Sequence, residues 1–193
     1  MFARTPSDRS DSSKVITYIN ICLSSFHFSL HNDIINHRDI LLISFLNNHV
    51  CYYIMNIYSD SSHTALKYLK DTKVNIDNIL VMTGDFNIRN SLWDTSFPHH
   101  SSISNDLIII ADSFNLALSI PTNPCPTRYF DTVGEANSVI DLMFLRYGSS
   151  ELDRHLIHPD SRLSSDHAPL TITIPIANEI VSTSKLSIPQ NSK

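Results

Sequence analysis

The sequence predicts an α/β protein, a layered sandwich of two mixed β-sheets flanked by helices. Short apolar runs rich in β-branched and aromatic residues have the length of strands, and two amphipathic segments between them have the period of helices. Strands and helices follow one another in mixed order, without a strict strand-helix-strand alternation. With only three glycines, the chain lacks both glycine-rich loops that bind nucleotide phosphates.

Apolar runs in the first half of the chain predict four strands. Three of them lie at residues 15–21 (VITYINI), 39–46 (DILLISFL) and 50–58 (VCYYIMNIY). Only the polar NNH of residues 47–49 separates the last two, which predicts a hairpin. The fourth strand is expected at residues 78–83 (NILVMT).

Two segments have the apolar spacing of helices. Residues 60–72 begin with Asp and Ser side chains suited to capping a helix, and Leu66 and Leu69 follow at helical spacing. Residues 102–115 carry apolar side chains at positions i, i+3, i+4 and i+7, namely Leu107, Ile110, Ala111 and Phe114. Each helix therefore has one apolar face to place against a sheet.

The rest of the chain predicts three short strands, at residues 116–120, 138–145 and 168–174. The proline-rich residues 121–129 and a long polar loop at residues 146–165 separate them.

Length and composition indicate one domain, which we place at residues 15–176. Residues 1–14 and 177–193 lack apolar periodicity and are expected to be loose tails. The three cysteines have no metal-site spacing, and no apolar run is long enough to span a membrane, so we expect a reduced, intracellular protein. A formal net charge of -5 gives no basic field, so a polyanionic partner requires a metal ion or a local basic patch.

The motif GDFN follows the strand at residues 78–83. Gly84 permits a sharp turn, and Asp85 and Asn87 project to the same side of an extended segment. They are expected to line a cleft at the carboxyl end of a strand, where α/β sheets commonly bind ligands. A plain Asp-Asn turn is the alternative interpretation.

A carboxylate also interrupts the apolar run SVIDLMFL. By alternation Ile140 and Leu142 share one face, so Asp141 lies with Met143 on the other. If both faces are covered, Asp141 is a buried carboxylate that needs a donor partner. The alternative is an edge strand whose second face is in water.

Asp166 and His167 come just before the last strand. Neighbours on an extended chain point in opposite directions, so Asp166 is expected to face a metal ion and His167 a substrate oxygen, with the second ring nitrogen of His167 on Asp141. Such a pair favours the imidazolium form, which suits contact with a phosphate. On its own, SDH is also typical of a solvated turn.

These motifs occur in a familiar order. GDFN, SVIDLMFL and SSDH, preceded by MNIYS, resemble the endonuclease/exonuclease/phosphatase superfamily of metal-dependent phosphodiester hydrolases. The resemblance is strongest to the endonuclease domain of LINE-type, non-LTR retrotransposons, and it covers most of residues 15 to 174.

The resemblance implies a role for each motif residue. Asp85 would orient or deprotonate the attacking water, and Asn87 would hold that water or the scissile phosphate. Asp141 would pair with His167, whose charge would stabilise the phosphoryl group. Tyr58 would bond a phosphate oxygen or the leaving group. The remaining implied positions are Asp166 at the metal and, in supporting roles, Asn56, Thr127 and Ser165.

The resemblance also implies Mg²⁺, with Mn²⁺ as a substitute, DNA as the substrate and, for a working retroelement nuclease, a place in the nucleus. The sequence points to no membrane and no protein partner. Family members begin with two strands that carry an Asn and then a metal-binding Glu. Because the three glutamates of this sequence all follow Tyr58, we expect those first strands and that Glu to be missing.

Two further functions stay open. One is a non-catalytic remnant of a mobile element that keeps the fold and weak binding, which the missing Glu favours. The other is a phosphatase of the same superfamily. A serine hydrolase is disfavoured because the G-x-S-x-G motif is absent.

Overall fold

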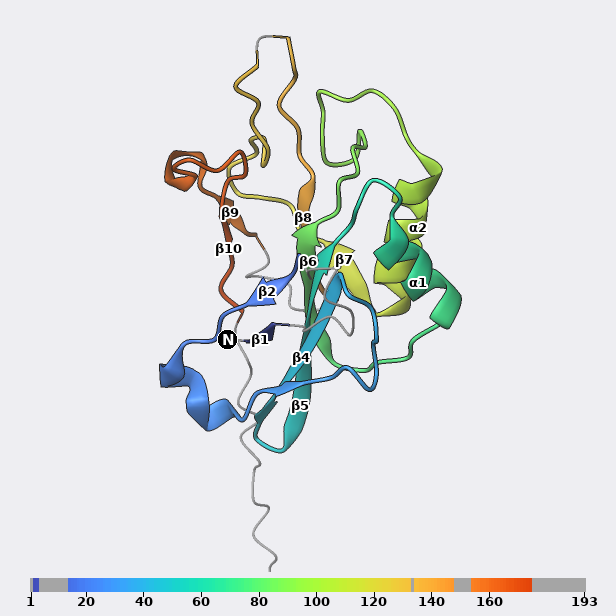
Figure 1. The fold of residues 1–193 in the computed structure, drawn as a ribbon, viewed down its shortest axis with the longest axis vertical. Helices are drawn as coiled ribbons and strands as arrows, with labels where there is room; N and C mark the ends of the chain where they lie inside the picture. Colours follow the sequence, from blue (N-terminus) through green and yellow to red (C-terminus); the bar gives the residue numbers. More distant parts are fainter. Residues whose placement is uncertain (1, 4–13, 133, 148–153, 175–193) are drawn as a thin grey trace, which may run out of the picture.

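The computed structural model describes residues 2–3, 14–132, 134–147 and 154–174. Its centre is a six-stranded mixed sheet in the order β3-β4-β5-β6-β8-β7. Both helices cover one face of this sheet, and two small strand pairs lie on the other side (Figure 1). The layered α/β prediction is confirmed, although the second layer of the described chain consists of two separate strand pairs and not one mixed sheet.

The elements have the following bounds. The large sheet contains β3 (Ser29–Leu30), β4 (Ile40–Asn47), β5 (Val50–Tyr58), β6 (Ile79–Asp85), β7 (Leu116–Leu118) and β8 (Asp141–Arg146). The strand pairs are β1 (Phe2–Ala3) with β2 (Ile16–Thr17), and β9 (Leu156–Ile157) with β10 (Leu170–Thr171). The helices are α1 (Thr64–Thr72), α2 (Ser102–Ser113) and the 3-10 helices η1 (Ile21–Phe26) and η2 (Pro159–Ser161). Among the strands of the described residues, only β5 and β6 pair in parallel.

The predicted hairpin joins β4 and β5. Asn47 pairs with Val50, and the two residues between them, Asn48 and His49, have φ values of 48° and 65°. Positive φ at both central positions is the type I′ pattern, whose twist matches that of the flanking strands. The polar NNH therefore fixes the register of the two strands.

Both helices are stabilised at their first turns and by burial. Asp60 accepts a hydrogen bond from the Thr64 amide at 2.9 Å, and Ser101 and Ser104 form a reciprocal capping box. The residues expected to be buried are all in the main core, namely Leu66, Leu69, Leu107, Ile110, Ala111 and Phe114. The helical periodicity of the sequence therefore identified the faces that cover the sheet.

Strand β8 lies between β6 and β7, so it is not an edge strand, and buried side chains cover both of its faces. Leu142 and Phe144 pack in the main core with the helices, whereas Met143 and Leu145 pack on the opposite face with Leu170. The predicted alternation is confirmed, and the alternative of an edge strand facing water is excluded.

The prediction of a strand at residues 15–21 is wrong in its second half, because only Ile16–Thr17 of this segment form a strand. The side-chain carbonyl of Asn20 accepts a hydrogen bond from the Cys22 amide, and its backbone carbonyl accepts one from the Leu23 amide. This local bonding turns the chain into η1, since Asn side chains compete with a strand for backbone donors.

The polar loop expected at residues 146–165 contains a strand, β9. Asn123 holds it by accepting the Ile157 amide and donating to the Ile157 carbonyl, at 3.0 and 2.7 Å. Its partner β10 is the strand expected at residues 168–174, shortened to two residues. The Asn123 side chain therefore makes two hydrogen bonds to Ile157 of the kind that a neighbouring strand would make, and these stabilise the two-residue strand.

The tails expected at residues 1–14 and 177–193 lie mostly outside the described residues. Phe2–Ala3 pair with β2. The domain limits at residues 15 and 176 therefore stay a prediction. No helix in the described part of the chain is long and apolar enough to cross a membrane.

Gly84 pairs with Ile57 across β5 and β6. A Cβ atom at this position would lie 1.8 Å from the Ile57 carbonyl oxygen, and φ is +148°. We expect Gly84→Ala to lower the free energy of unfolding by about 2–4 kcal/mol, measured by urea denaturation. Gly134→Ala is the control, because Gly134 has a φ of +102° and no atom within 4 Å of its added Cβ. Equal losses in the two variants would contradict the close contact.

His155 is 3% exposed, and its Nδ1 lies 2.9 Å from the Ser119 hydroxyl. Burial lowers the pKa of His155 below the usual 6.5. Below pH 6.5 the unfolded chain therefore binds a proton at this histidine, whereas the folded chain does not. The free energy of unfolding thus falls as the pH falls, by at most about 1.4 kcal/mol per pH unit. We expect His155→Gln to lose less stability than the natural chain between pH 7.5 and 5.5, measured by urea denaturation. Parallel pH profiles would contradict the buried neutral histidine.

Candidate active site

Three of the predicted site residues lie in one row across the large sheet. Strands β5 and β6 pair with Tyr58 beside Asp85, and β6 and β8 pair with Asp85 beside Asp141. Alternation along the strands places these three side chains on the face opposite the helices, which is the face on which Met143 packs. Tyr58 itself packs on that face. The row marks the carboxyl ends of β5 and β6, the edge at which a ligand site was expected.

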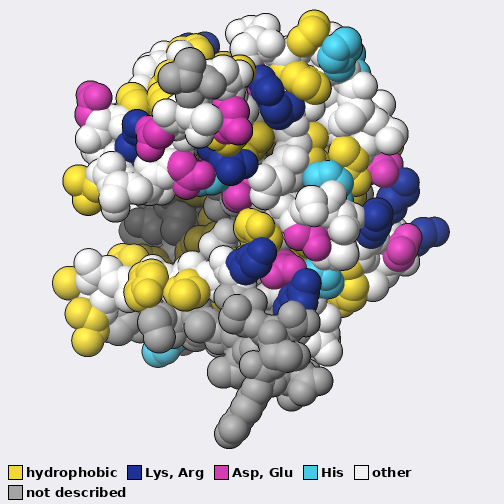
Figure 2. Space-filling model, turned by 45° about the horizontal axis from the view of Figure 1, so that its top comes forward, with side chains coloured by type: hydrophobic (Ala, Val, Ile, Leu, Met, Phe, Trp, Pro, Cys, Tyr) yellow, Lys and Arg dark blue, Asp and Glu magenta, His cyan; other side chains and the backbone are white. Residues whose placement is uncertain are grey.

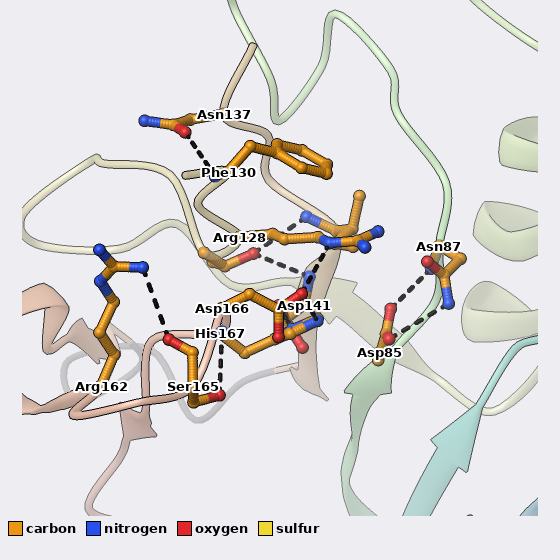
Figure 3. A network of polar contacts seen from close by, with 12 residues as sticks. Asp85, Asn87, Arg128, Phe130, Asn137, Asp141, Arg162, Ser165, Asp166 and His167 are labelled. Carbon is orange, nitrogen blue, oxygen red and sulfur yellow. Dashed lines mark hydrogen bonds and ion pairs between the residues drawn. The ribbon is translucent and has the colours of Figure 1, made fainter. Parts of the chain in front are cut away.

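Asp85 and Asn87 form a tight turn after β6. One carboxylate oxygen of Asp85 accepts the Asn87 backbone amide at 3.0 Å, and the other accepts the side-chain amide at 3.1 Å. The Asn87 side chain also donates to the Ser59 carbonyl at 2.9 Å, which ties the turn to the end of β5. Asn87 has a φ of 51°, a conformation that Asn tolerates better than most residues. The two side chains lie on the same side (Figure 3), but through a turn at Asn87 and not along an extended segment, and Gly84 lies within β6.

Asp141 and His167 form the predicted pair. Nδ1 of His167 lies 2.8 Å from Oδ2 of Asp141, and the Ser165 hydroxyl accepts a hydrogen bond from the His167 amide at 3.0 Å. The hydrogen bond to Asp141 is the largest influence on His167 and raises its pKa above the usual 6.5, although burial opposes this. Since Nδ1 is directed at Asp141, Nε2 is the nitrogen left to meet a substrate.

Thr127 joins the segments that carry this pair. Its buried hydroxyl accepts the backbone amides of Ile140 and Asp141, each at 3.0 Å, and its carbonyl accepts the Ala168 amide at 2.8 Å. One residue therefore fixes both the start of β8 and the segment after His167. A supporting role of Thr127 in the chemistry of the site stays a prediction.

Negative charge is concentrated between β6 and β8. Ligand atoms of Asp85, Asp141 and His167 all lie within 4.8 Å of one another. Burial, and then the charge of Asp141, raise the pKa of Asp85 from 3.8 to about 6. A carboxylate in this position favours either a proton or a nearby cation.

This donor set fits a hard divalent cation such as Mg²⁺, which prefers carboxylate oxygens and would offset the charge that raises the pKa of Asp85. Asp166, the predicted metal residue, is outside the cluster of three. Its side chain is 54% exposed, and its Oδ2 lies 3.3 Å from Nε of Arg128 and 3.8 Å from Nε2 of His167. No glutamate of the described chain belongs to the cluster.

Tyr58 and Asn56 face the same side of β5 but contact the N-terminal segment. The Tyr58 hydroxyl lies 3.3 Å from Nζ of Lys14, which also lies over the tyrosine ring at 4.6 Å. Asn56 donates to the Thr17 hydroxyl at 3.4 Å. Tyr58 therefore borders the site, while Asn56 holds the neighbouring layer.

Sequence reasoning missed Arg128. Its backbone lies between the segments of Ser138 and His167, with one bridge to each, and its side chain lies over the site (Figure 3). The only signal was its position next to Thr127 in a proline-rich segment. A single arginine in an irregular segment gives no periodicity from which its direction can be read.

Comparison with known proteins identifies a family and a similar fold. The family model described as endonuclease-reverse transcriptase matches residues 48–171. The fold is similar to the endonuclease domain of TRAS1, a telomere-specific non-LTR retrotransposon, with a TM-score of 0.61 and 15% identity over 79% of this chain and 70% of that chain. No curated protein matches the sequence.

Two further solved structures are more distant. TDP2 of D. rerio, complexed with a single-strand DNA product, has a TM-score of 0.44 and 15% identity over 68% of this chain and 59% of that chain. Beta toxin of Staphylococcus aureus, with bound magnesium ions, has a TM-score of 0.42 and 11% identity over 68% of this chain and 56% of that chain. This chain thus spans little more than half the length of either.

We expect Thr127→Val to leave two backbone amides at the start of β8 without an acceptor. The free energy of unfolding should fall by about 2–4 kcal/mol in urea denaturation. Thr127→Ser is the matched control, since it keeps the hydroxyl and should retain most of the stability. A Val variant as stable as the Ser variant would show that this hydroxyl does not organise the site.

Proposed function

We infer the function from the family: this chain belongs to the endonuclease-reverse transcriptase family of the endonuclease/exonuclease/phosphatase superfamily, whose fold is of the phosphodiesterase and nuclease type. We propose that it is a metal-dependent phosphodiester hydrolase that nicks DNA, as the endonuclease domain of a non-LTR retrotransposon. The observation that carries the proposal is the meeting of Asp85, Asp141 and His167 within 4.8 Å at one end of the sheet.

Asp85 and Asn87 serve the attacking water in this proposal. Asp85 orients the attacking water through its carboxylate, and a cation bound beside it would oppose the rise in its pKa and keep it ionised near pH 7. The Asn87 side chain donates to Asp85 and is held by Ser59, which fixes its direction. Its Oδ1 accepts no hydrogen bond from the described residues, so it is available to orient a water molecule.

His167 and Tyr58 serve the phosphate. Asp141 fixes the imidazole through Nδ1, so a protonated His167 offers Nε2–H to a phosphoryl oxygen on which negative charge increases during attack. Tyr58, beside Asp85 in the sheet, offers its hydroxyl to a phosphate oxygen or to the leaving oxygen. Hydrogen bonds that strengthen as this charge develops accelerate the reaction.

The metal in this proposal is Mg²⁺, with Mn²⁺ as a substitute. Asp85 is the carboxylate of the cluster best placed to hold the ion, because Asp141 is already hydrogen-bonded to His167. Asp166 adds an exposed carboxylate at the margin of the cluster. Bound there, the ion would offset the charge of the phosphate and of the leaving oxygen.

DNA is the proposed substrate, and the nucleus is the place where a retroelement nuclease meets it. The net charge of -5 means that binding depends on local cations and on the metal, not on an overall basic surface. Figure 2 shows Lys and Arg side chains interspersed with acidic ones on one face of the molecule.

One observation favours a second candidate, a non-catalytic remnant that binds phosphate weakly. No glutamate of the described chain lies in the cluster, so the cation would rest on fewer carboxylates than in the family pattern. A phosphatase of the same superfamily has no observation in its favour beyond the shared fold.

We expect the protein to nick supercoiled plasmid DNA in the presence of Mg²⁺ and to lose this activity with EDTA. Asp85→Ala and His167→Ala should each reduce the nicking rate at least about 100-fold, because each removes a group that acts on the reacting atoms. Asp106→Ala, a change on α2, is the control for removal of a carboxylate. Full activity in either site variant would contradict the mechanism, and an inactive but folded natural chain would favour the remnant.

A further inference from the structure

Arg128 extends from the segment that holds the Asp141–His167 pair. Its amide and carbonyl bond to Ser138 at 2.9 and 3.0 Å, and its neighbours on either side bond to the backbone around His167. The backbone is therefore fixed by strand-like bonds on both sides. A side chain that starts from so fixed a backbone has a well-defined direction.

Two contacts hold the guanidinium group. Nε lies 3.3 Å from Oδ2 of Asp166, and the group lies over the Phe130 ring at 4.7 Å from the ring centre. Stacking on an aromatic face fixes the plane of the guanidinium and leaves its outer edge open. In Figure 3 that edge is directed away from Asp166, toward the Asp85–Asn87 turn.

The outer edge has no partner in the described protein. Arg128 is 32% exposed in its side chain, and its two terminal nitrogens donate to no acceptor among the described residues. An arginine with two free donors beside a carboxylate cluster is suited to bind an oxyanion with both nitrogens.

We propose that Arg128 is a further catalytic residue, which binds a non-bridging oxygen of the phosphodiester that is cleaved. This inference rests on the proposed function. The Asp166–Arg128 ion pair then has a role beyond stability: it aims the guanidinium before substrate arrives. An ion pair with a half-exposed carboxylate contributes little to the fold by itself.

The proposal predicts a larger effect on the reaction than on the fold. Because negative charge on the non-bridging oxygens increases during the attack, Arg128→Ala should lower kcat for plasmid nicking about 10²–10³-fold. Arg128→Lys should lie between the natural chain and Arg128→Ala, because lysine keeps the charge but not the two-pronged geometry. Lys70→Ala is the control, since Lys70 is also a cation paired with an aspartate, at 2.8 Å, and lies on α1.

A phosphorothioate oligonucleotide separates direct contact from a structural role. With sulfur in place of the oxygen that Arg128 binds, the natural chain should cleave one diastereomer more slowly than the other, and Arg128→Ala should lose part of that preference. A variant that keeps kcat within about threefold, or one that keeps the full preference, would overturn the proposal.

A binding measurement keeps this test separate from that of the proposed function. With Ca²⁺ in place of Mg²⁺, the slope of log Kd for a duplex oligonucleotide against log salt should fall by about 0.9 in Arg128→Ala and stay unchanged in Lys70→Ala. If the natural chain binds DNA but does not cleave it, the proposed function fails, and this slope still decides whether Arg128 contacts a phosphate. An unchanged slope would overturn the contact.

Discussion

The hydrogen bond between Asp141 and His167 is the constraint on which the site depends. It joins the start of β8 in the large sheet to a segment 26 residues further along the chain, which belongs to the opposite layer. The Thr127 hydroxyl aligns the Asp141 end, and the Ser165 hydroxyl aligns the His167 end. Without this bond, one carboxylate would lie in a covered strand without its donor, and the histidine would have no fixed direction.

The same arrangement brings two carboxylates into one place. Adjacent strands set Asp85 beside Asp141, and burial together with this neighbour makes ionisation of Asp85 costly. Natural proteins accept such a cost chiefly where charge has a function. In this chain the cost fits a site that receives a cation and an anionic substrate together, with His167 and Arg128 supplying fixed positive charge at its edge.

Much of the fold and part of the site could be predicted because they follow from short-range periodicity. The placement of Asp141 on the face opposite Leu142 follows from strand alternation, and the hairpin at Asn48 and His49 follows from its turn residues. The pairing of Asp141 with His167 depended on the family resemblance, because no local rule connects residues in different layers.

The features that sequence reasoning missed are single side-chain contacts between distant segments. Asn123 creates β9 by bonding to Ile157, and Asn20 ends a strand that its apolar neighbours favour. Arg128 is directed toward the site only because its backbone is bonded on both sides. Such contacts have no periodic pattern, so they become visible only when the segments are placed together.

Binding of one cation beside Asp85, Asp141 and His167 can be followed by titrating Mn²⁺ while recording the histidine ring protons by NMR. We expect substoichiometric Mn²⁺ to broaden the His167 resonances and to leave those of His49, in the hairpin at the far end of β5, sharp, and we expect excess Mg²⁺ to reverse the effect. Resonances of His167 that stay sharp while others broaden would contradict this binding.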